Sequence, residues 1–202
     1  MLKKKLATPL REEEIKELKV GDVVYLNGDV YTARDKAHQR IIEYHGTDAE
    51  AEIPIENGAV LYHCGPLMRK SDGDWEIIAA GPTTSSRMEA TTPEIIEKLR
   101  IRGIIGKGGM GNGTRTALQR YGCVYFAMTG GAAVLTAARI KAVKAVYWAD
   151  LGLAEAVWQL RVEEFGPLVV SMDAHGDSLY EQIAETAQRN VRAWTSSVSE
   201  RL

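Results

Sequence analysis

Short apolar runs alternate with segments of helical spacing along the second half of this chain. The runs at 101–105, 124–128 and 168–172 have the length and residue types of buried strands. Residues 114–120 and 132–144 show the spacing expected of helices. Together with a β-rich first half, this alternation predicts an α/β fold.

The first half contains further strand and helix signals. The pair Asn27-Gly28 predicts a hairpin within residues 20–30, because this dipeptide favours tight two-residue turns. Strands are expected at 59–63 and 75–80, and helices at 35–44, after Pro93 and after a capping box formed by Ser178 and Glu181.

Length, charge and cysteine content limit the possible classes of protein. The 202 residues suit one domain, 1–202, with residues 1–19 as a peripheral N-terminal segment. The net charge of −2 argues against nucleic-acid binding, and no apolar run is long enough to span a membrane. The basic start lacks the apolar stretch of a secretory signal, so a cytoplasmic protein is expected. Two cysteines, Cys64 and Cys123, are too few and too far apart to hold an iron–sulfur cluster.

The first candidate site is the segment Arg34-Asp35-Lys36-Ala37-His38, at a predicted strand-to-helix turn. A guanidinium beside the start of a helix suits a carboxylate ligand, since arginine can donate two parallel hydrogen bonds. In the alternative interpretation, Asp35 caps the helix, His38 packs against it and Arg34 forms a surface ion pair.

The second candidate is Thr83-Thr84-Ser85-Ser86-Arg87, which follows a predicted strand. Four consecutive hydroxyl groups and a guanidinium suit an oxyanion or a carboxylate. A Ser/Thr-rich turn with a helix cap remains the structural alternative.

The third candidate is the glycine-rich loop 106–113, in which Gly106, Gly108 and Gly111 match the dinucleotide pattern GxGxxG. That pattern also requires an acidic residue about 20 positions later, where this chain has none. The loop nevertheless allows close approach of a ligand, and Lys107 adds a positive charge there.

A fourth cluster, Asp173-Ala174-His175-Gly176-Asp177, could bind a metal ion or cap the last helix, and capping is the favoured interpretation. Arg34, Arg87 and Lys107 each follow a predicted strand. If these strand ends meet, they form a site for a ligand with two carboxylates.

These motifs, in this order, resemble the β subunit, or C-terminal half, of the class I fumarase and L-tartrate dehydratase family. The matching stretches lie between about residues 20 and 180. They are GDVYTARDKAH (28–38), YHCGP (62–66), GPTTSSRM (81–88), IGKGGM (105–110), YFAMTGGAA (125–133) and EFGPLVVSMD (164–173).

The resemblance implies a three-layer fold of the swivelling β/β/α type and a hydro-lyase that is incomplete alone. A separate α subunit would carry a [4Fe–4S] cluster, in an α2β2 or similar hetero-oligomer. The reaction implied is reversible dehydration of (S)-malate to fumarate, with L-tartrate dehydration as the alternative. A nucleotide-binding module using residues 106–113 is the interpretation from a different class.

The resemblance also implies roles for individual residues, with no metal ligand in this chain. Arg34, Arg87, Lys107 and Gly106 would bind the substrate. Thr83 would contact it and take part in catalysis, together with the neighbouring Thr84. The remaining catalytic candidates, which match the motif, are Asp35 and His38.

Overall fold

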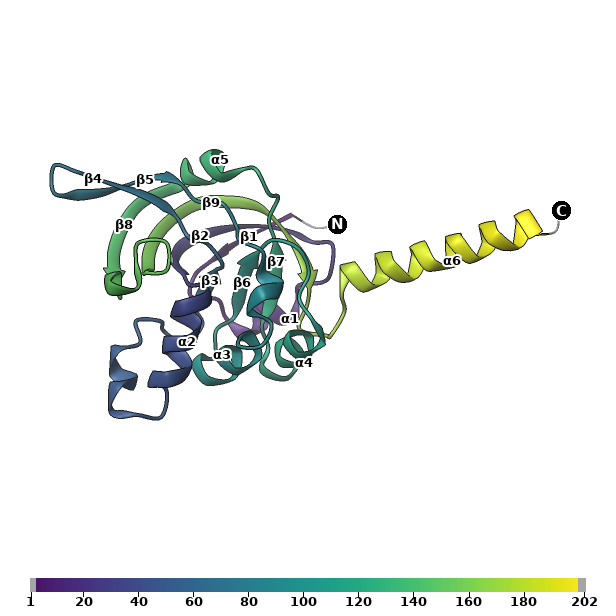
Figure 1. Ribbon diagram of the computed structural model, residues 1–202, viewed down its shortest axis with the longest axis horizontal. Coiled ribbons are helices and arrows are strands. Elements are labelled where there is room, and N and C mark those ends of the chain that lie inside the picture. Colours follow the sequence, from purple (N-terminus) through teal and green to yellow (C-terminus); the bar gives the residue numbers. More distant parts are fainter. Residues whose placement is uncertain (1–2, 200–202) are drawn as a thin grey trace.

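A seven-stranded mixed sheet organises the fold, in the order β1-β2-β3-β6-β7-β9-β8. The structure is a computed structural model in which residues 3–199 are described. The strands of this sheet are β1 (Lys3–Ala7), β2 (Val23–Thr32), β3 (Val60–Tyr62), β6 (Gly103–Gly106), β7 (Val124–Ala127), β8 (Ile140–Tyr147) and β9 (Val157–Met172). A separate hairpin, β4 (Leu67–Ser71) and β5 (Asp74–Ala79), projects from the body (Figure 1).

The sheet closes on itself because the long strand β9 has several neighbours. It pairs antiparallel with β7, with β8 and with β2, and the β2 pairing runs from Val23 opposite Val169 to Tyr31 opposite Gln159. Strands β3, β6 and β7 are parallel to one another, so their carboxyl ends lie at the same edge. That edge carries the loops in which the candidate site residues lie.

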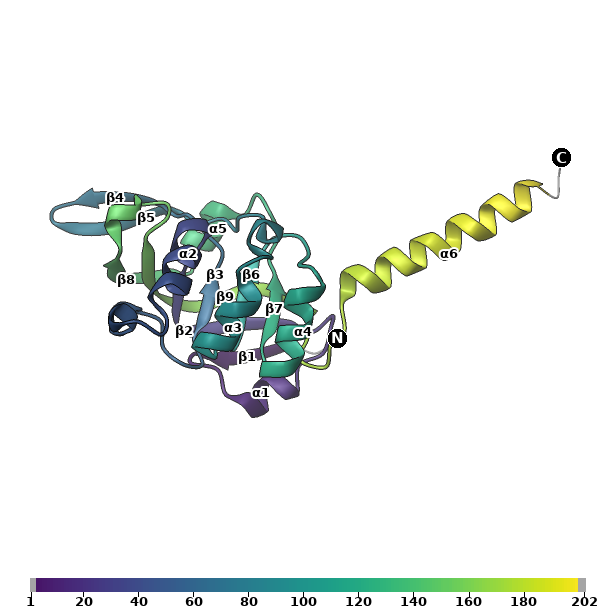
Figure 2. The same ribbon diagram turned by 60° about the horizontal axis from the view of Figure 1, so that its bottom comes forward.

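Helices cover the outer face of the parallel strands (Figures 1 and 2). They are α2 (Asp35–Tyr44), α3 (Thr92–Leu99) and α4 (Asn112–Tyr121), while α1 (Glu12–Lys16), α5 (Ala133–Ala137) and α6 (Leu179–Ser199) lie elsewhere. Two buried apolar clusters result: one between the β layers, which contains Trp158 and Phe165, and one between the parallel strands and helices, which contains Ile41 and Ile104. The predicted α/β class is confirmed, and the two cores separate three layers.

The expected hairpin at Asn27-Gly28 is wrong, because β2 continues through both residues. Gly28 has φ +111° and lies at an irregularity in the pairing with β9. A Cβ there would lie 2.4 Å from the Thr8 hydroxyl oxygen. The glycine therefore allows the N-terminal segment to approach closely. An Asn-Gly pair is also typical of a hairpin turn, so the local sequence does not distinguish the two roles.

The expected helix at 132–144 is also wrong beyond its first turn. The helix α5 ends at Ala137, and β8 begins at Ile140 and pairs antiparallel with β9. The alanines and lysines of this segment favour helix, but a partner strand more than ten residues away along the chain overrides that preference.

The N-terminal segment is an integral part of the domain rather than a peripheral one. Strand β1 extends the sheet in parallel with β2, and Leu10, Ile15 and Leu18 are buried in the core. Strand β9 begins at Val157, well before the expected start at Leu168. None of the helices within residues 3–199 combines the length and the apolar character that a membrane span requires.

Candidate carboxylate-binding site

The three segments with candidate cations meet at the carboxyl edge of the parallel strands. Backbone hydrogen bonds place the hydroxyl-rich segment there: Thr83 N donates to the His63 carbonyl (2.7 Å), and Ser85 N donates to the Lys107 carbonyl (3.1 Å). Arg34 follows β2 and precedes α2. Sequence reasoning identified these segments, but only the strand pairing shows that they are neighbours.

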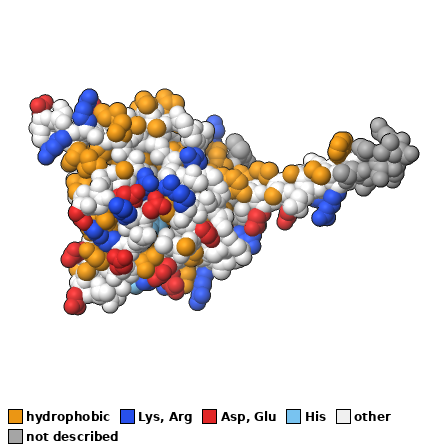
Figure 3. Space-filling view, viewed as in Figure 1, with side chains coloured by type: hydrophobic (Ala, Val, Ile, Leu, Met, Phe, Trp, Pro, Cys, Tyr) orange, Lys and Arg blue, Asp and Glu red, His pale blue; other side chains and the backbone are white. Residues whose placement is uncertain are grey.

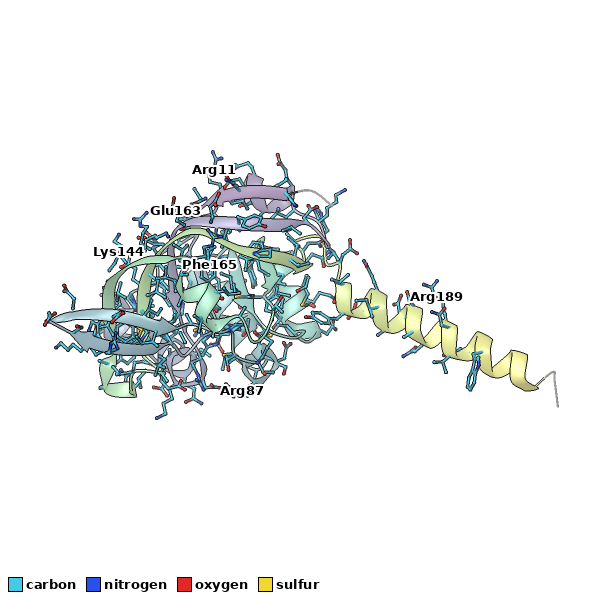
Figure 4. All side chains as sticks on the ribbon, turned by 90° about the horizontal axis from the view of Figure 1, so that it is seen from above. Arg11, Arg87, Lys144, Glu163, Phe165 and Arg189 are labelled. Atoms are coloured by element: carbon cyan, nitrogen blue, oxygen red, sulfur yellow. The ribbon has the colours of Figure 1, made fainter. Side chains whose placement is uncertain are left out.

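Two guanidinium groups converge on one carboxylate at this edge. Oδ2 of Asp35 lies 3.0 Å from Arg87 Nη2 and 3.3 Å from Arg34 Nε. The same Arg87 nitrogen donates to the Thr83 hydroxyl (3.0 Å). Arg87 lies at the edge of the body in Figure 4, and its side chain is half-exposed. The two guanidinium groups thus already hold one carboxylate of the chain, and that of Arg87 remains half-exposed.

Glu155 is a part of the site that sequence reasoning missed. Its carboxylate pairs with Arg34 Nε (2.9 Å) and accepts a hydrogen bond from the Lys36 backbone N–H (3.0 Å). Gly65 allows Arg34 to lie close, since a Cβ there would be 2.6 Å from Nη1. Nothing in the local sequence distinguishes Glu155 from a surface acid, because it reaches Arg34 only through the fold.

Lys107 joins the site through its backbone and its side-chain stem. It forms a parallel bridge with the exposed Thr84, and its Cδ would lie 3.2 Å from a Cβ at Gly130. Within residues 3–199, Lys107 forms no ion pair with an acidic side chain. Its charge is therefore available to an anion.

His38 lies behind the site rather than on its surface. Its side chain is buried, and Nδ1 lies 3.1 Å from the Thr91 hydroxyl. Burial lowers the pKa of His38 to about 4, although the nearby Asp35 opposes this shift. The imidazole is therefore neutral near pH 7, and in this position it supports the start of α2.

A second buried imidazole, that of His63, anchors the hydroxyl-rich segment to the protein interior. Nδ1 of His63 lies 2.9 Å from the Ser85 hydroxyl, and both side chains are fully buried. The rings of His63 and His38 are 5.1 Å apart. Gly106 is packed closely under Ser85, because a Cβ there would lie 1.9 Å from Oγ. The segment that carries Thr83 thus has a rigid base.

The glycine-rich loop binds an internal carboxylate, that of Glu89. Its oxygens accept from Gly111 N (2.7 Å), Thr114 N (3.0 Å) and the Thr114 hydroxyl (2.7 Å). A Cβ at Gly111 would lie 2.7 Å from the Glu89 carboxyl carbon. The start of α4, where a nucleotide phosphate would bind, is already used by this anion. This geometry disfavours the nucleotide-binding hypothesis.

The Asp173–Asp177 cluster forms a turn. Asp173 is buried and accepts from the backbone N–H groups of Val20 (3.0 Å), His175 (2.9 Å) and Asp177 (3.1 Å). The helix cap comes instead from Ser178, whose hydroxyl accepts from Glu181 N (3.4 Å).

The described residues of this chain do not fit an iron–sulfur cluster. No group of three or more His, Cys, Asp or Glu side chains within residues 3–199 is arranged to hold a metal ion. Both cysteines are free and buried, and burial raises the pKa of the Cys64 thiol to about 12. Thiolates, which are the cluster ligands, are therefore disfavoured here.

Side chains of both charges gather over the start of α2, on the face shown in Figure 3. Comparison with known proteins identifies the family of this chain. The model of the family described as "Fumarase C-terminus" matches residues 2–183. The chain belongs to this family. The resemblance predicted from the motifs is thereby confirmed.

Curated relatives align over most of the chain. The "L(+)-tartrate dehydratase subunit beta" of Escherichia coli K12 is 41% identical over 179 residues, which are 88% of this chain and 87% of that protein. A Methanocaldococcus jannaschii protein, "Putative L(+)-tartrate dehydratase subunit beta", is 47% identical over 86% of this chain and 89% of its own length. The "Putative fumarate hydratase class I" of Geobacillus stearothermophilus is 47% identical over 90% of this chain but only 34% of that longer protein.

Proposed function

We propose that this chain is the β subunit of a fumarate hydratase, which interconverts (S)-malate with fumarate and water. Its role is to hold the substrate carboxylates. The observation that carries the proposal is the convergence of Arg34 and Arg87 on one carboxylate oxygen of Asp35, at 3.3 and 3.0 Å. In the complex, a substrate carboxylate would take up part of this donor set.

The chemistry of dehydration explains why such donors are useful. Loss of the proton next to a carboxylate places additional negative charge on that carboxylate. Arginine and lysine donors positioned beforehand stabilise this charge without having to reorganise. Lys107, which has no acidic partner within the described part of the chain, suits the second carboxylate.

Thr83 is the proposed catalytic side chain, with Thr84 beside it. A threonine hydroxyl is a weak base, so it needs an activating neighbour. The Arg87 guanidinium donates to the Thr83 oxygen at 3.0 Å and thereby favours negative charge on that oxygen. Asp35 orients both guanidinium groups, and the buried His38 supports the helix that carries Asp35.

The partner is an α subunit in an α2β2 or similar hetero-oligomer. The names of the relatives from E. coli and M. jannaschii, which include "subunit beta", support a second subunit. The [4Fe–4S] cluster implied by the resemblance finds no fitting ligand set among residues 3–199, so we assign it to the α subunit.

A second candidate reaction is the dehydration of L-tartrate. It is favoured by the names of the M. jannaschii and E. coli relatives, and the identity to the Geobacillus fumarate hydratase sequence is no higher than that to the archaeal protein. Tartrate carries a second hydroxyl group, which needs its own hydrogen-bond partner in the site.

Anaerobic assays of the reconstituted α/β complex on (S)-malate and L-tartrate test the choice of substrate. We expect a higher kcat/KM for malate. An equal or higher kcat/KM for tartrate would establish the second candidate instead.

Arginine variants test the site itself. Arg34→Ala and Arg87→Ala should each reduce kcat/KM by at least about 100-fold, since each removes charge-assisted hydrogen bonds worth roughly 1.5–3 kcal/mol apiece. The matched control is Arg69→Ala, which removes an exposed guanidinium paired with Glu76 on the β4–β5 hairpin. If all three variants keep wild-type turnover, the chain has a structural role only.

A further inference from the structure

The helix α6 extends away from the body in both ribbon views (Figures 1 and 2). Its first turn is fixed: the Tyr180 ring packs on Gly109, where a Cβ would lie 3.2 Å from the ring, and Glu181 pairs with Arg115. The helix comprises 21 residues, which corresponds to a length of about 30 Å. A helix in this position depends on tertiary or quaternary packing of an apolar face for most of its stability.

One face of α6 carries apolar side chains at coiled-coil spacing. Successive members are four, three, four and three residues apart, as in the a and d positions of a heptad. The members of this seam are Tyr180, Ala184, Ala187, Val191 and Trp194. Tyr180 and Trp194 are 40% and 67% exposed, and Ile183 beside the seam is 58% exposed. Figure 3 shows hydrophobic side chains spaced along the helix.

The boundary of the family match indicates which partner the seam binds. The family match ends at residue 183, whereas α6 continues to Ser199. A partner common to the whole family would bind surfaces that the family shares, which lie on the body. The part of the seam beyond residue 183 is therefore expected to bind a partner that also has this C-terminal part of α6.

The seam is self-complementary in an antiparallel pair. When a positions face d positions, Ala184 lies opposite Trp194 of the second copy, and Ala187 lies opposite its Val191. Small residues then face large ones, which allows the two helices to interdigitate without voids. The flanking positions Gln188 and Asn190 are uncharged, so two identical helices meet without like-charge repulsion there.

We propose that α6 is a dimerisation helix that pairs antiparallel with α6 of a second copy of this chain. The contact is isologous, as expected for a twofold dimer, because each residue pair occurs twice. The proposal is independent of which dicarboxylate the enzyme uses.

The mass of the purified full-length chain in solution, measured by light scattering during gel filtration, is the first test. We expect about twice the 22.2 kDa of the monomer. Ala187→Glu should give a monomer, because it places two carboxylates in the seam while glutamate keeps good helix propensity. Gln182→Glu, which adds the same charge outside the seam, should remain dimeric. Circular dichroism checks that both variants are folded.

Cysteine cross-linking tests the antiparallel arrangement, and the native Cys64 and Cys123 are buried and should not interfere. Ala184→Cys and Trp194→Cys chains should form a disulfide-linked dimer when mixed and oxidised, but not separately. Strong cross-linking within each single variant would refute the antiparallel arrangement. A monomeric wild-type chain, a dimeric Ala187→Glu variant, or a seam that is covered only when the α subunit is added would overturn the proposal.

Discussion

Replacement of Ser85 by alanine should destabilise the fold through His63. In the native structure the Ser85 hydroxyl is the partner of His63 Nδ1 at 2.9 Å, and both side chains are fully buried. His63 Nε2 already has no hydrogen-bond partner among the described residues. In Ser85→Ala both ring nitrogens would be buried without a partner.

The expected cost follows from this geometry. A buried polar group that loses its partner costs about 1–3 kcal/mol, and the removed oxygen is too small to leave a large cavity. For a domain of 202 residues this corresponds to a fall in Tm of about 2–12 °C. The Ser85 hydroxyl also contacts the Tyr125 hydroxyl, but Tyr125 keeps its hydrogen bond to the Gly108 carbonyl (2.9 Å), so most of the cost should come from His63.

Thermal unfolding followed by circular dichroism measures this effect, and Ser171→Ala is the matched control. Ser171 is equally buried, but its hydroxyl makes only a long contact with the Tyr125 carbonyl (3.4 Å). We expect the control to change Tm by less than half as much. Equal changes in the two variants would refute the argument that the orphaned imidazole, rather than loss of any buried hydroxyl, determines the cost.

Three further predictions concern groups close to this network. Because burial lowers the folded-state pKa of His38 from 6.5 to about 4, the unfolded chain binds the extra proton first as the pH falls. His38 alone should therefore lower the free energy of unfolding by about 3 kcal/mol between pH 6.5 and 4, and urea titrations should show a shallower fall for His38→Gln. Gly106→Ala should cost about 1–3 kcal/mol by overpacking against Ser85, measured as a lower urea midpoint, and an unchanged midpoint would contradict the packing argument. Cys64 should react with a thiol reagent only on unfolding, because burial raises its pKa to about 12; rapid labelling of the native chain would contradict this.

Local patterns predicted the elements that local interactions form. The helix at 35–44 coincides with α2, and Pro93 lies in the first turn of α3, as expected for a residue without a backbone N–H. The runs at 101–105 and 124–128 correspond to β6 and β7, since buried parallel strands have few polar residues.

Elements that depend on distant partners were predicted less well. The alanines and lysines of β8 predict a helix, but hydrogen bonds to β9 stabilise a strand instead. Gly28 was predicted to lie in a turn, whereas in the structure it lies in a strand against Thr8. In both cases the deciding contact comes from a residue that lies outside the local sequence segment.

The sequence by itself determined the family, the order of the motifs and which cations were candidates, because these depend on residue identity alone. It also excluded a cysteine-held cluster within this chain. The tertiary structure decided the rest of the site. It placed Asp35 between Arg34 and Arg87, and brought Glu155 to Arg34 from more than 100 residues away. It also placed the Glu89 carboxylate against the backbone of the glycine-rich loop. The physical reason is that strand pairing determines which loops lie at the same edge of the sheet.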